Sequence, residues 1–371
     1  MLRLLSTLLV CMFASPVFAD DKNKPKLPTL TPKEIEEGWI LLFDGETTFG
    51  WKTEGDVKVD QGILVVNGTK GGKITSRVQF SVPLEILAEW RWSGDGGALL
   101  KLGGSGSSVP EGQWTEHLMT VTPEGVGART TNKTRVPGGV WKDGIGNSGG
   151  LFNTPISTEV PKGAVASFRS IKVRPLGAKP LFNGKDLDGW EINEADPKRV
   201  ASKWSVTPAG ELAVKNGPGD LVCEKEFDNF VLQFECKTNG KALNSGIFFR
   251  CIPGQYQNGY EAQIQNAYKD NDRTKPADFG TGAIYRRVPA RKVVSNDNEW
   301  FTMTVIADGK HFATWVNGYQ TVDWTDERKA DENPRKGFRA KKGPISIQGH
   351  DPTTDILFRN IRIAELPHEN K

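Results

Sequence analysis

Two segments of this sequence occur twice, in the same order. The segment LFDGETTFGW (residues 42–51) returns as LFNGKDLDGW (residues 181–190), and FRSIKVRPL (168–176) returns as FRNIRIAEL (358–366). Internal similarity of this kind indicates one structural module present in two copies. The chain is therefore limited to an architecture that this module can form twice.

The two copies differ in length. Phe43 and Phe182, near the start of each copy, lie 139 positions apart, whereas Arg169 and Arg359, near the end, lie 190 apart. The second copy therefore holds 51 more residues between the same landmarks. We expect the chemistry of the protein in this additional stretch.

The repeat divides the 371 residues into two units of ordinary domain size. We predict a first unit over residues 39–176, a linker over residues 177–180 and a second unit over residues 181–371. Residues 20–38 come before the first unit. They are rich in lysine and proline at their start, which predicts an extended tether.

A short helix is predicted directly before the first unit. Thr31 is a suitable N-cap, Pro32 suits the first helical position, and Glu34 completes a capping box. Gly38 then ends the helix.

The first nineteen residues have the pattern of a secretory signal peptide. Arg3 precedes an apolar run over residues 4–13, and small residues stand before the expected cleavage site after Ala19. This run is shorter than the roughly 20 residues that a spanning helix needs, and no other segment approaches that length. Lipidation of Cys11 is disfavoured because the bulky Val10 precedes it. We therefore predict a secreted or periplasmic protein with no membrane span.

Charge and cysteine spacing argue against two kinds of partner. The 48 basic and 45 acidic residues leave a formal charge of +3, which gives no sign of nucleic acid binding. Once the leader is removed, three cysteines remain, and this odd number leaves at least one thiol without a partner in the chain. Cys236 and Cys251 could form a disulfide across a hairpin, or stay with Cys223 as buried thiols. No C-x-x-C or H-x-x-x-H spacing predicts a structural zinc site.

Short apolar or alternating runs, separated by turn residues, make up most of the chain. The clearest turns are Asn67-Gly68, Asn216-Gly217, Asp308-Gly309 and Asn317-Gly318. With 41 glycines and 22 prolines, the pattern predicts an antiparallel all-β protein. Each unit is expected to form two packed sheets, as in a jelly-roll sandwich.

Three predicted strands of the second unit place polar groups on one face. Strand alternation aligns Glu261 with Gln263 in one strand and Gln348 with His350 in another, while Arg250 ends a third. Such a surface could bind a sugar through fixed hydrogen-bonding groups. The alternative is the solvated outer face of an ordinary sandwich. The low charge of these strands favours partial burial instead.

The number of carboxylates restricts the reactions that this face could support. A retaining glycosidase needs two carboxylates roughly 5 Å apart, and here Glu261 is followed only by glutamines. Direct double displacement is therefore disfavoured. One acid or base with neutral partners fits either plain sugar binding or a reaction through an enolate.

Seven segments of the second unit resemble, in order and spacing, the 3-keto-disaccharide hydrolase domain family. They are LFNGKDLDGW, LVCEKEFDNFVLQFE, NSGIFFR, GYEAQIQNAYKD, GTGAIYRR, NEWFTMTVIADGKHFATWVNG and FRNIRIAEL. The resemblance extends from Leu181 to Leu366 and implies a concanavalin A-like jelly-roll fold. It also implies cleavage of glycosides whose sugar already carries a ketone at C3. Such a ketone acidifies the proton on C2, so that a base can form an enolate that expels the C1 substituent, after which water adds.

This resemblance implies roles for individual residues. Glu261 or His350 would act as the base and the other as the acid, while Arg250 or a bound divalent cation would stabilise the enolate. The substrate-binding candidates carry amide or phenol groups: Asn244, Gln263, Tyr285 and Gln348. Many family members have an acidic residue where this chain has Gly349, between Gln348 and His350.

The first unit resembles the family much less. It keeps the two repeated segments, and residues 114–117 are its only echo of the segment GYEAQIQ. We interpret it as a degenerate copy with a structural or binding role. If the second unit were not catalytic, tandem carbohydrate-binding modules with increased avidity, or an interaction scaffold, would be the alternatives. The sugar, its linkage, the need for a metal ion and the oligomeric state stay open.

Overall fold

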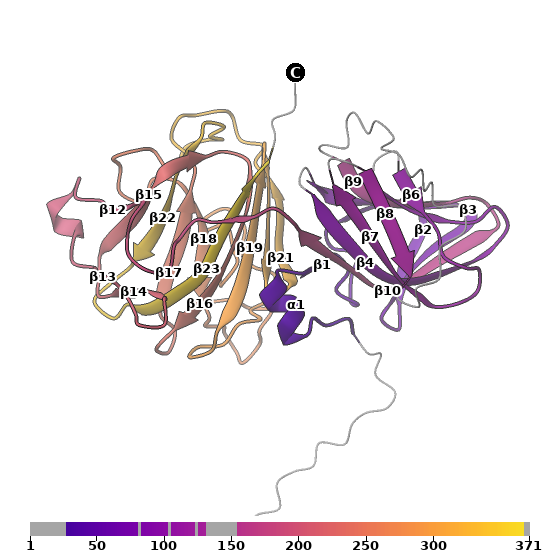
Figure 1. The fold of residues 1–371 in the computed structure, drawn as a ribbon, viewed down its shortest axis with the longest axis horizontal. Coiled ribbons are helices and arrows are strands. Elements are labelled where there is room, and N and C mark those ends of the chain that lie inside the picture. Colours follow the sequence, from indigo (N-terminus) through magenta and orange to yellow (C-terminus); the bar gives the residue numbers. More distant parts are fainter. Residues whose placement is uncertain (1–26, 81–82, 103–104, 123–124, 131–153, 367–371) are drawn as a thin grey trace, which may run out of the picture.

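The structure is a computed structural model that describes residues 27–366 apart from 81–82, 103–104, 123–124 and 131–153. The predicted signal peptide, residues 1–19, and Cys11 lie outside the described residues. Two β-rich units stand side by side, with one short α-helix at their junction (Figure 1). The predicted all-β fold is confirmed. Within the described part, no helix has the length and apolar character needed to span a membrane.

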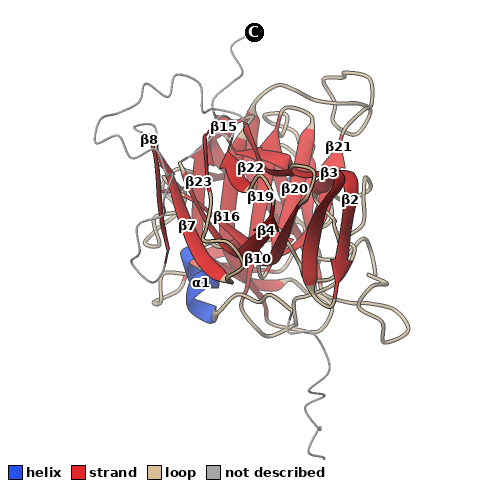
Figure 2. Cartoon of the chain, turned by 90° about the vertical axis from the view of Figure 1, so that its right-hand side faces the viewer, coloured by secondary structure: helices blue, strands red, loops and turns tan. Residues whose placement is uncertain are grey.

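Helix α1 (Pro32–Glu37) has the predicted ends. The hydroxyl of Thr31 accepts a bond from the Glu34 amide at 3.2 Å, and the Glu34 carboxylate accepts one from the Thr31 amide at 2.7 Å. Gly38 ends the helix in the left-handed region, with φ of 87°. Lys172 of the first unit binds Glu34, and Gln233 of the second donates to the Gly38 carbonyl, so the helix contacts both units. Figure 2 shows α1 in blue at the lower edge of the strands.

The first unit is one continuous antiparallel sheet in the order β6-β5-β9-β3-β10-β4-β7-β8, with β1 added on β10 and β2 on β3. Its strands are β1 (Ile40–Leu41), β2 (Trp51–Asp60), β3 (Ile63–Phe80), β4 (Leu84–Gly94), β5 (Leu99–Leu102), β6 (Ser105–Ser107), β7 (Thr115–Thr122), β8 (Gly125–Thr130), β9 (Thr154–Val160) and β10 (Ala164–Pro175).

The length of β3 explains why the strands of the first unit form one continuous hydrogen-bonded sheet where two separate sheets were expected, and why the predicted turn at Asn67-Gly68 is wrong. This strand pairs with β10 through Leu64 to Asn67 and with β9 from Gly72 onward, so it joins what would otherwise be two sheets. Asn67-Gly68 therefore lies inside β3 and makes no hairpin turn. The pairing with β2 shifts register just after Asn67, where Gly68 and Gly72 allow close backbone approach.

The second unit has the two packed sheets that the sequence predicts. One has the order β13-β14-β23-β16-β19-β20-β21, with β11 on β23, and the other the order β12-β15-β22-β17-β18. Its strands are β11 (Lys179–Pro180), β12 (Trp190–Ile192), β13 (Lys203–Val206), β14 (Leu212–Lys215), β15 (Gly219–Phe227), β16 (Phe230–Thr238), β17 (Asn244–Phe249), β18 (Tyr260–Gln265), β19 (Phe301–Asp308), β20 (His311–Val316), β21 (Tyr319–Thr325), β22 (Gly343–Gly349) and β23 (Asp355–Glu365), and a 3-10 turn covers Pro197–Arg199. Asp308-Gly309 and Asn317-Gly318 join β19 to β20 and β20 to β21, as expected for hairpins.

The repeated segments make matching contacts in both units. In each, two successive amides face one carbonyl oxygen at 2.8 and 3.4 Å: Leu42 and Phe43 face Ile171, and Leu181 and Phe182 face Ile361. Trp51 donates its indole N–H to the Leu42 carbonyl at 2.6 Å, and Trp190 donates to the Leu181 carbonyl at 3.1 Å. Every matched pair keeps the sequence offsets of 139 and 190 found above.

The pairing register also corrects one assignment. Thr115 of β7 lies opposite Trp90, and Phe301 of β19 lies opposite Cys236, so β7 corresponds to β19. Residues 114–117 therefore match residues 300–303 and not the segment GYEAQIQ, which forms β18. Both units stack an arginine on the matched tryptophan, with the guanidinium carbon 4.0 Å from the ring centroid: Arg169 on Trp114 and Arg359 on Trp300.

The two units share a continuous apolar interface. Val231, Ile306, Ala313 and Trp315 belong to the second unit, yet they pack into the core of the first. They lie on the face of their sheet that points away from the second unit's own core. The Trp315 indole also donates to the Leu41 carbonyl at 2.9 Å. The three cysteines of the second unit are buried free thiols, so the alternative disulfide between Cys236 and Cys251 is not formed.

His117 gives a test of the first unit's packing. Its ring is fully buried, with Trp90 Nε1 at 3.3 Å from Nδ1 and Ser107 Oγ at 3.0 Å from Nε2. Because an indole N–H only donates, Nδ1 must accept, and the ring is neutral. Burial lowers the pKa of His117 to about 4. As the pH falls from about 6.5 to 4, the unfolded chain gains a proton that the folded chain excludes, so stability falls.

Replacing His117 by methionine, the residue at the matched position 303, should remove this pH dependence. Wild type should lose up to about 3 kcal/mol more than H117M between those pH values. The free energy of unfolding from urea titrations at several pH values measures the two slopes. Equal slopes would contradict the assignment, whatever the absolute cost of the substitution.

Candidate functional site

A cleft of about 350 Å³ lies on the outer face of the sheet β12-β15-β22-β17-β18. Strands β17, β18 and β22 supply its floor, and the loops after β17, β18 and β21 supply its walls. The lining residues include Asn244, Phe248, Gln257, Glu261, Gln263, Tyr285, Arg286, Arg287, Arg335, Gln348 and His350. Six of the seven residues predicted from the sequence are therefore brought together.

Strand alternation selects the residues of the floor. In β18, Tyr260, Ala262 and Ile264 pack into the core, while Glu261 and Gln263 face the cleft. The loops cover this outer face so closely that the exposed fractions of Glu261, Gln263 and Gln348 are 7%, 1% and 6%. A solvated outer face, the alternative considered from the sequence, is therefore not what these residues form.

Gly246 makes room at the centre of the floor. It lies opposite Gln263 of β18, and the pairing of β17 with β22 places Gln348 on its other side. A side-chain carbon at this position would lie 2.4 Å from Glu261 Oε1. The absence of a side chain therefore lets the Glu261 carboxyl group lean over the strand and into the cleft.

The Glu261 carboxyl group is desolvated. Burial raises its pKa to about 8, the Asp278 carboxylate adds to the rise, and Arg286 and Arg335 oppose it. Among the described residues, no donor lies within hydrogen-bonding distance of the carboxyl oxygens. Near neutral pH the group therefore holds its proton and can donate it. A perturbed carboxyl group in a cleft is typical of a functional site.

Two amide oxygens in the floor lack partners. Gln263 donates to the Asp278 carbonyl and carboxylate, both at 3.1 Å, and Gln348 donates to Gln257 Oε1 at 2.9 Å. These bonds fix each amide with its oxygen unpaired within the described residues. Buried polar atoms normally have a partner, so these oxygens are suited to accept bonds from hydroxyl groups of a ligand.

His350 stands at the rim, directly after β22. Its Nδ1 lies 2.8 Å from Asp351 Oδ2, and Thr353 holds the other oxygen of that carboxylate. Burial alone would raise the pKa of Asp351, but the bonds from Thr353 and His350 outweigh it and the pKa is lowered. An ionised Asp351 orients the imidazole and leaves Nε2 for other contacts. Many family members have an acidic residue where this chain has Gly349. In this chain Asp351, on the other side of His350, supplies a carboxylate next to the imidazole.

Arg250 does not reach the cleft, and its prediction as a site residue is corrected. Its side chain is fully buried, where it donates to the carbonyls of Asp228, Gly309 and Arg339 and to the side chain of Asn229. Alternation along β17 would continue the cleft face from Phe248 to Arg250. However, φ of 49° at Arg250 ends the strand and turns this side chain away.

The remaining predicted residues line the cleft. Asn244 donates to Asp278 Oδ2 at 2.9 Å, next to Gln263 on the same carboxylate. Tyr285 is half-buried, and the Arg286 guanidinium stacks on its ring at 5.2 Å. Sequence reasoning missed Asp278, Arg286, Arg335, Gln257 and Asp351. Only Asp351 had a sequence signal, its place beside His350.

The donor set does not fit a resident divalent cation. Of the described residues that line the cleft, Glu261 is the only carboxylate, and it is protonated near neutral pH. No group of three or more His, Cys, Asp and Glu side chains in the described ranges is arranged to hold a metal ion. Ca²⁺ and Mg²⁺ sites normally use several oxygen ligands with ionised carboxylates among them.

Arg250 should matter for stability and not for substrate binding. Replacing it by lysine removes the fork of donors that four acceptors share, at an expected cost of about 3 kcal/mol. Thermal unfolding should show the loss, while the pKa of Glu261, followed by NMR of its carboxyl carbon, should stay unchanged. A change in that pKa at full stability would return Arg250 to the site.

Comparisons with known proteins match the part of the chain that contains the cleft. The sequence profile of the 3-keto-alpha-glucoside-1,2-lyase-like domain matches residues 177–364. A 3-keto-disaccharide hydrolase from Bacteroides thetaiotaomicron is 27% identical and aligns with 50% of this chain and 77% of its own length.

Two solved structures from Parabacteroides distasonis, both provisionally described as glycosyl hydrolases, are also similar. One is 22% identical, has a TM-score of 0.42 and covers 52% of this chain and 94% of its own; the other is 27% identical, has a TM-score of 0.40 and covers 51% and 100%. The profile match contains every residue of the cleft named above and more than half of the chain. The chain therefore belongs to the 3-keto-alpha-glucoside-1,2-lyase-like domain family.

Proposed function

We propose that the second unit cleaves glycosides whose sugar carries a ketone at C3. The observation that carries this proposal is a protonated, desolvated Glu261 in the same cleft as an oriented imidazole, His350. Family membership supports the substrate class, because the relative from B. thetaiotaomicron is named a 3-keto-disaccharide hydrolase. The cleft volume of about 350 Å³ suits a sugar.

His350 is the base in this proposal. Asp351 holds Nδ1, so Nε2 of the neutral ring can take the proton from C2 of the keto-sugar. The electron pair of the broken C–H bond moves onto the C3 oxygen and gives an enolate. The neighbouring Asp351 carboxylate then stabilises the imidazolium that forms.

Glu261 is the acid. The enolate returns its electron pair to form the C1–C2 double bond, and the C1–O bond to the leaving group breaks. The carboxyl group of Glu261 supplies a proton to the departing oxygen, for which its raised pKa of about 8 is suited. Water then adds across the double bond, with oxygen bound to C1 and hydrogen to C2.

The enolate needs a positive partner, and Arg250 cannot supply it. Arg286 and Arg335 line the cleft. Both oppose the rise that burial causes in the pKa of Glu261, so their charges act inside the site. We assign the enolate oxygen to Arg286, because its guanidinium makes no hydrogen bond within the described residues and only stacks on Tyr285.

Sugar binding without turnover is the second candidate. The unpaired oxygens of Gln263 and Gln348 favour it equally, since they suit hydroxyl groups in either case. A synthetic 3-keto-glucoside separates the two: loss of the glycoside with release of its alcohol supports catalysis, whereas saturable binding without product supports a binding module.

We also propose that the protein is exported. We propose further that its first unit is a degenerate copy of the second, which the matched contacts of the two units support.

Replacing Glu261 by glutamine should abolish turnover and increase stability. As the pH rises from about 4.5 to about 8, the unfolded chain ionises Glu261 while the folded chain keeps it protonated, so the stability of the wild type falls. The neutral amide should therefore stabilise the protein by a few kcal/mol above about pH 8. Product release and thermal unfolding measure the two effects on one sample. Retained turnover would remove Glu261 from the mechanism.

The value of kcat/KM should fall as the pH rises above about 8. Glu261 must be protonated to act as the acid, and its pKa is about 8, so activity should decrease tenfold per unit well above that pH. The rate with a glycoside of p-nitrophenol gives a control, because this good leaving group needs little protonation. An equally steep loss with both substrates would contradict the assigned role.

A further inference from the structure

We propose that the first unit is part of the active site, because its loop from Leu42 to Trp51 fixes the segment that forms one wall of the cleft. The wall segment, Ile284–Lys292, begins in the cleft and ends at the interface between the units. The kinetic part of this proposal rests on the proposed function. The structural part does not, and it is tested separately below.

One end of the wall segment is tied to the floor of the cleft. The Tyr285 amide donates to the Glu261 carbonyl at 2.9 Å, and the Gln263 amide donates to the Ala283 carbonyl at 3.0 Å. A tight turn from Ile284 to Val288 then presents Tyr285 and Arg286 to the cleft. These bonds fix the start of the turn and leave its return path to other contacts.

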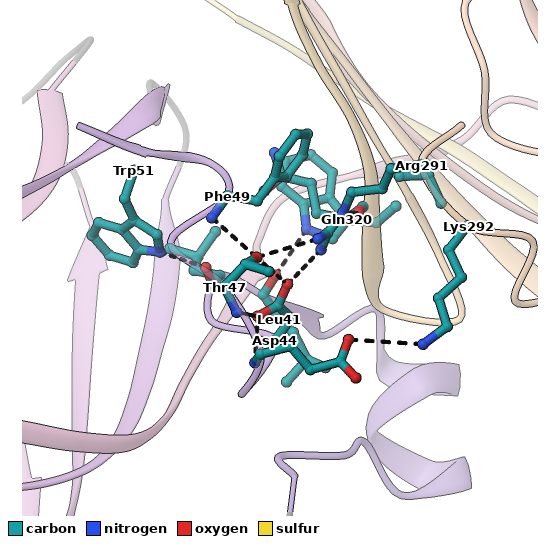
Figure 3. Close-up of polar contacts among 12 residues, drawn as sticks. Leu41, Asp44, Thr47, Phe49, Trp51, Arg291, Lys292 and Gln320 are labelled. Carbon is teal, nitrogen blue, oxygen red and sulfur yellow. Dashed lines mark hydrogen bonds and ion pairs between the residues drawn. The ribbon is translucent and has the colours of Figure 1, made fainter. Parts of the chain in front are cut away.

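The other end is held by both units. Within the second unit the Ala290 amide donates to the Phe279 carbonyl at 2.9 Å and the Arg291 amide to the Thr321 carbonyl at 3.1 Å, while the Arg291 side chain is held by the first unit. Arg291 donates from Nη2 to Asp44 Oδ2 at 2.6 Å and from Nη1 to Thr47 Oγ1 at 3.3 Å (Figure 3). Its guanidinium carbon lies 4.3 Å from the ring centroid of Phe49 and 4.3 Å from that of Tyr319. Nε donates to the Gln320 carbonyl at 2.8 Å. Three hydrogen bonds together with two aromatic contacts leave the guanidinium little freedom.

Asp44 is prepared for this contact. It is 8% exposed, and its Oδ1 accepts bonds from the amides of Glu46 and Thr47 at 2.8 and 2.7 Å. The loop therefore holds the carboxylate in place before Arg291 binds. Gly50 lies so close to Gln320 that an added side-chain carbon would be 2.2 Å from its Oε1, so the loop fits tightly against β21.

The second unit contains the same loop without this contact. Asn183 stands at the position of Asp44 and accepts the corresponding bonds from the amides of Lys185 and Asp186, at 2.7 and 3.1 Å. Asp188 stands at the position of Phe49. The carboxylate and the aromatic ring that hold Arg291 are therefore not required to build the loop. They distinguish the copy that faces the cleft wall.

This comparison supplies a variant that keeps the loop. Asn183 shows that asparagine forms the same turn, so Asp44→Asn should fold while losing the charged contact to Arg291. Glu46→Gln is the matched control, because Glu46 and Lys292 form a 3.7 Å pair at the surface whose loss should have little effect. Phe49→Ala is a second variant that changes no charge.

Hydrogen exchange of the full-length protein tests the structural part. In D44N the amides from Ile284 to Arg291 should exchange at least roughly tenfold faster, while those of β18 and of the first unit stay unchanged. F49A should act in the same direction, and E46Q should match wild type. Unchanged exchange of the wall segment, or a uniform increase over both units, would overturn the proposal.

Kinetics with a synthetic 3-keto-glucoside test the functional part. A displaced wall weakens binding around Tyr285 and Arg286, so KM should rise roughly tenfold in D44N while kcat changes less. Unchanged KM together with faster exchange would overturn the positioning role. If the wild type does not turn the compound over, the proposed function fails, and the exchange results alone decide whether the first unit holds the wall.

Discussion

The desolvated carboxyl group of Glu261 is the constraint on which the second unit depends. A carboxyl group that is 7% exposed and has no donor among the described residues is unfavourable unless it is neutral. The fold keeps it in place through Gly246, which leaves space above β17, and through loops that exclude water from the outer face of the sheet. The apolar core beneath that sheet stabilises the arrangement. Burial of this carboxyl group therefore lowers the stability of the fold, as is common at functional sites.

The two units show how one backbone framework leads to different outcomes. In both units the first strand pairs with the last strand, β1 with β10 and β11 with β23. In both, a tryptophan indole donates a hydrogen bond to the carbonyl of the residue nine positions before it. In the second unit the additional residues complete a separate sheet and the loops that cover it. In the first unit, β3 pairs with β10 at its start and with β9 further along, so all the strands belong to a single sheet. His117 lies in that core where the second unit has Met303, so the histidine is packed and not available for chemistry.

The sequence predicted the elements that follow a regular period. Alternation placed Glu261, Gln263 and Gln348 on one face, and the capping signals gave α1 to the residue. The prediction that Arg250 lies in the site was wrong because a single positive φ at this residue ends the strand alternation. No residue type other than glycine indicates such a position reliably in a sequence. Asp278, Arg286 and Arg335 come from loops, whose paths depend on tertiary contacts. The predicted turn at Asn67-Gly68 was wrong because the same residue pair also occurs at an irregularity within a long strand, here β3.

The apolar strip of Val231, Ile306, Ala313 and Trp315 has a consequence for how the chain is divided. The family match begins at residue 177, but the packing continues across that boundary, since these side chains belong to the core of the preceding unit. Separating the chain at that boundary would present an indole and three aliphatic groups to water, an aggregation hazard on an otherwise closed sheet. We therefore expect the unit that unfolds cooperatively to extend beyond the residues that the family match covers.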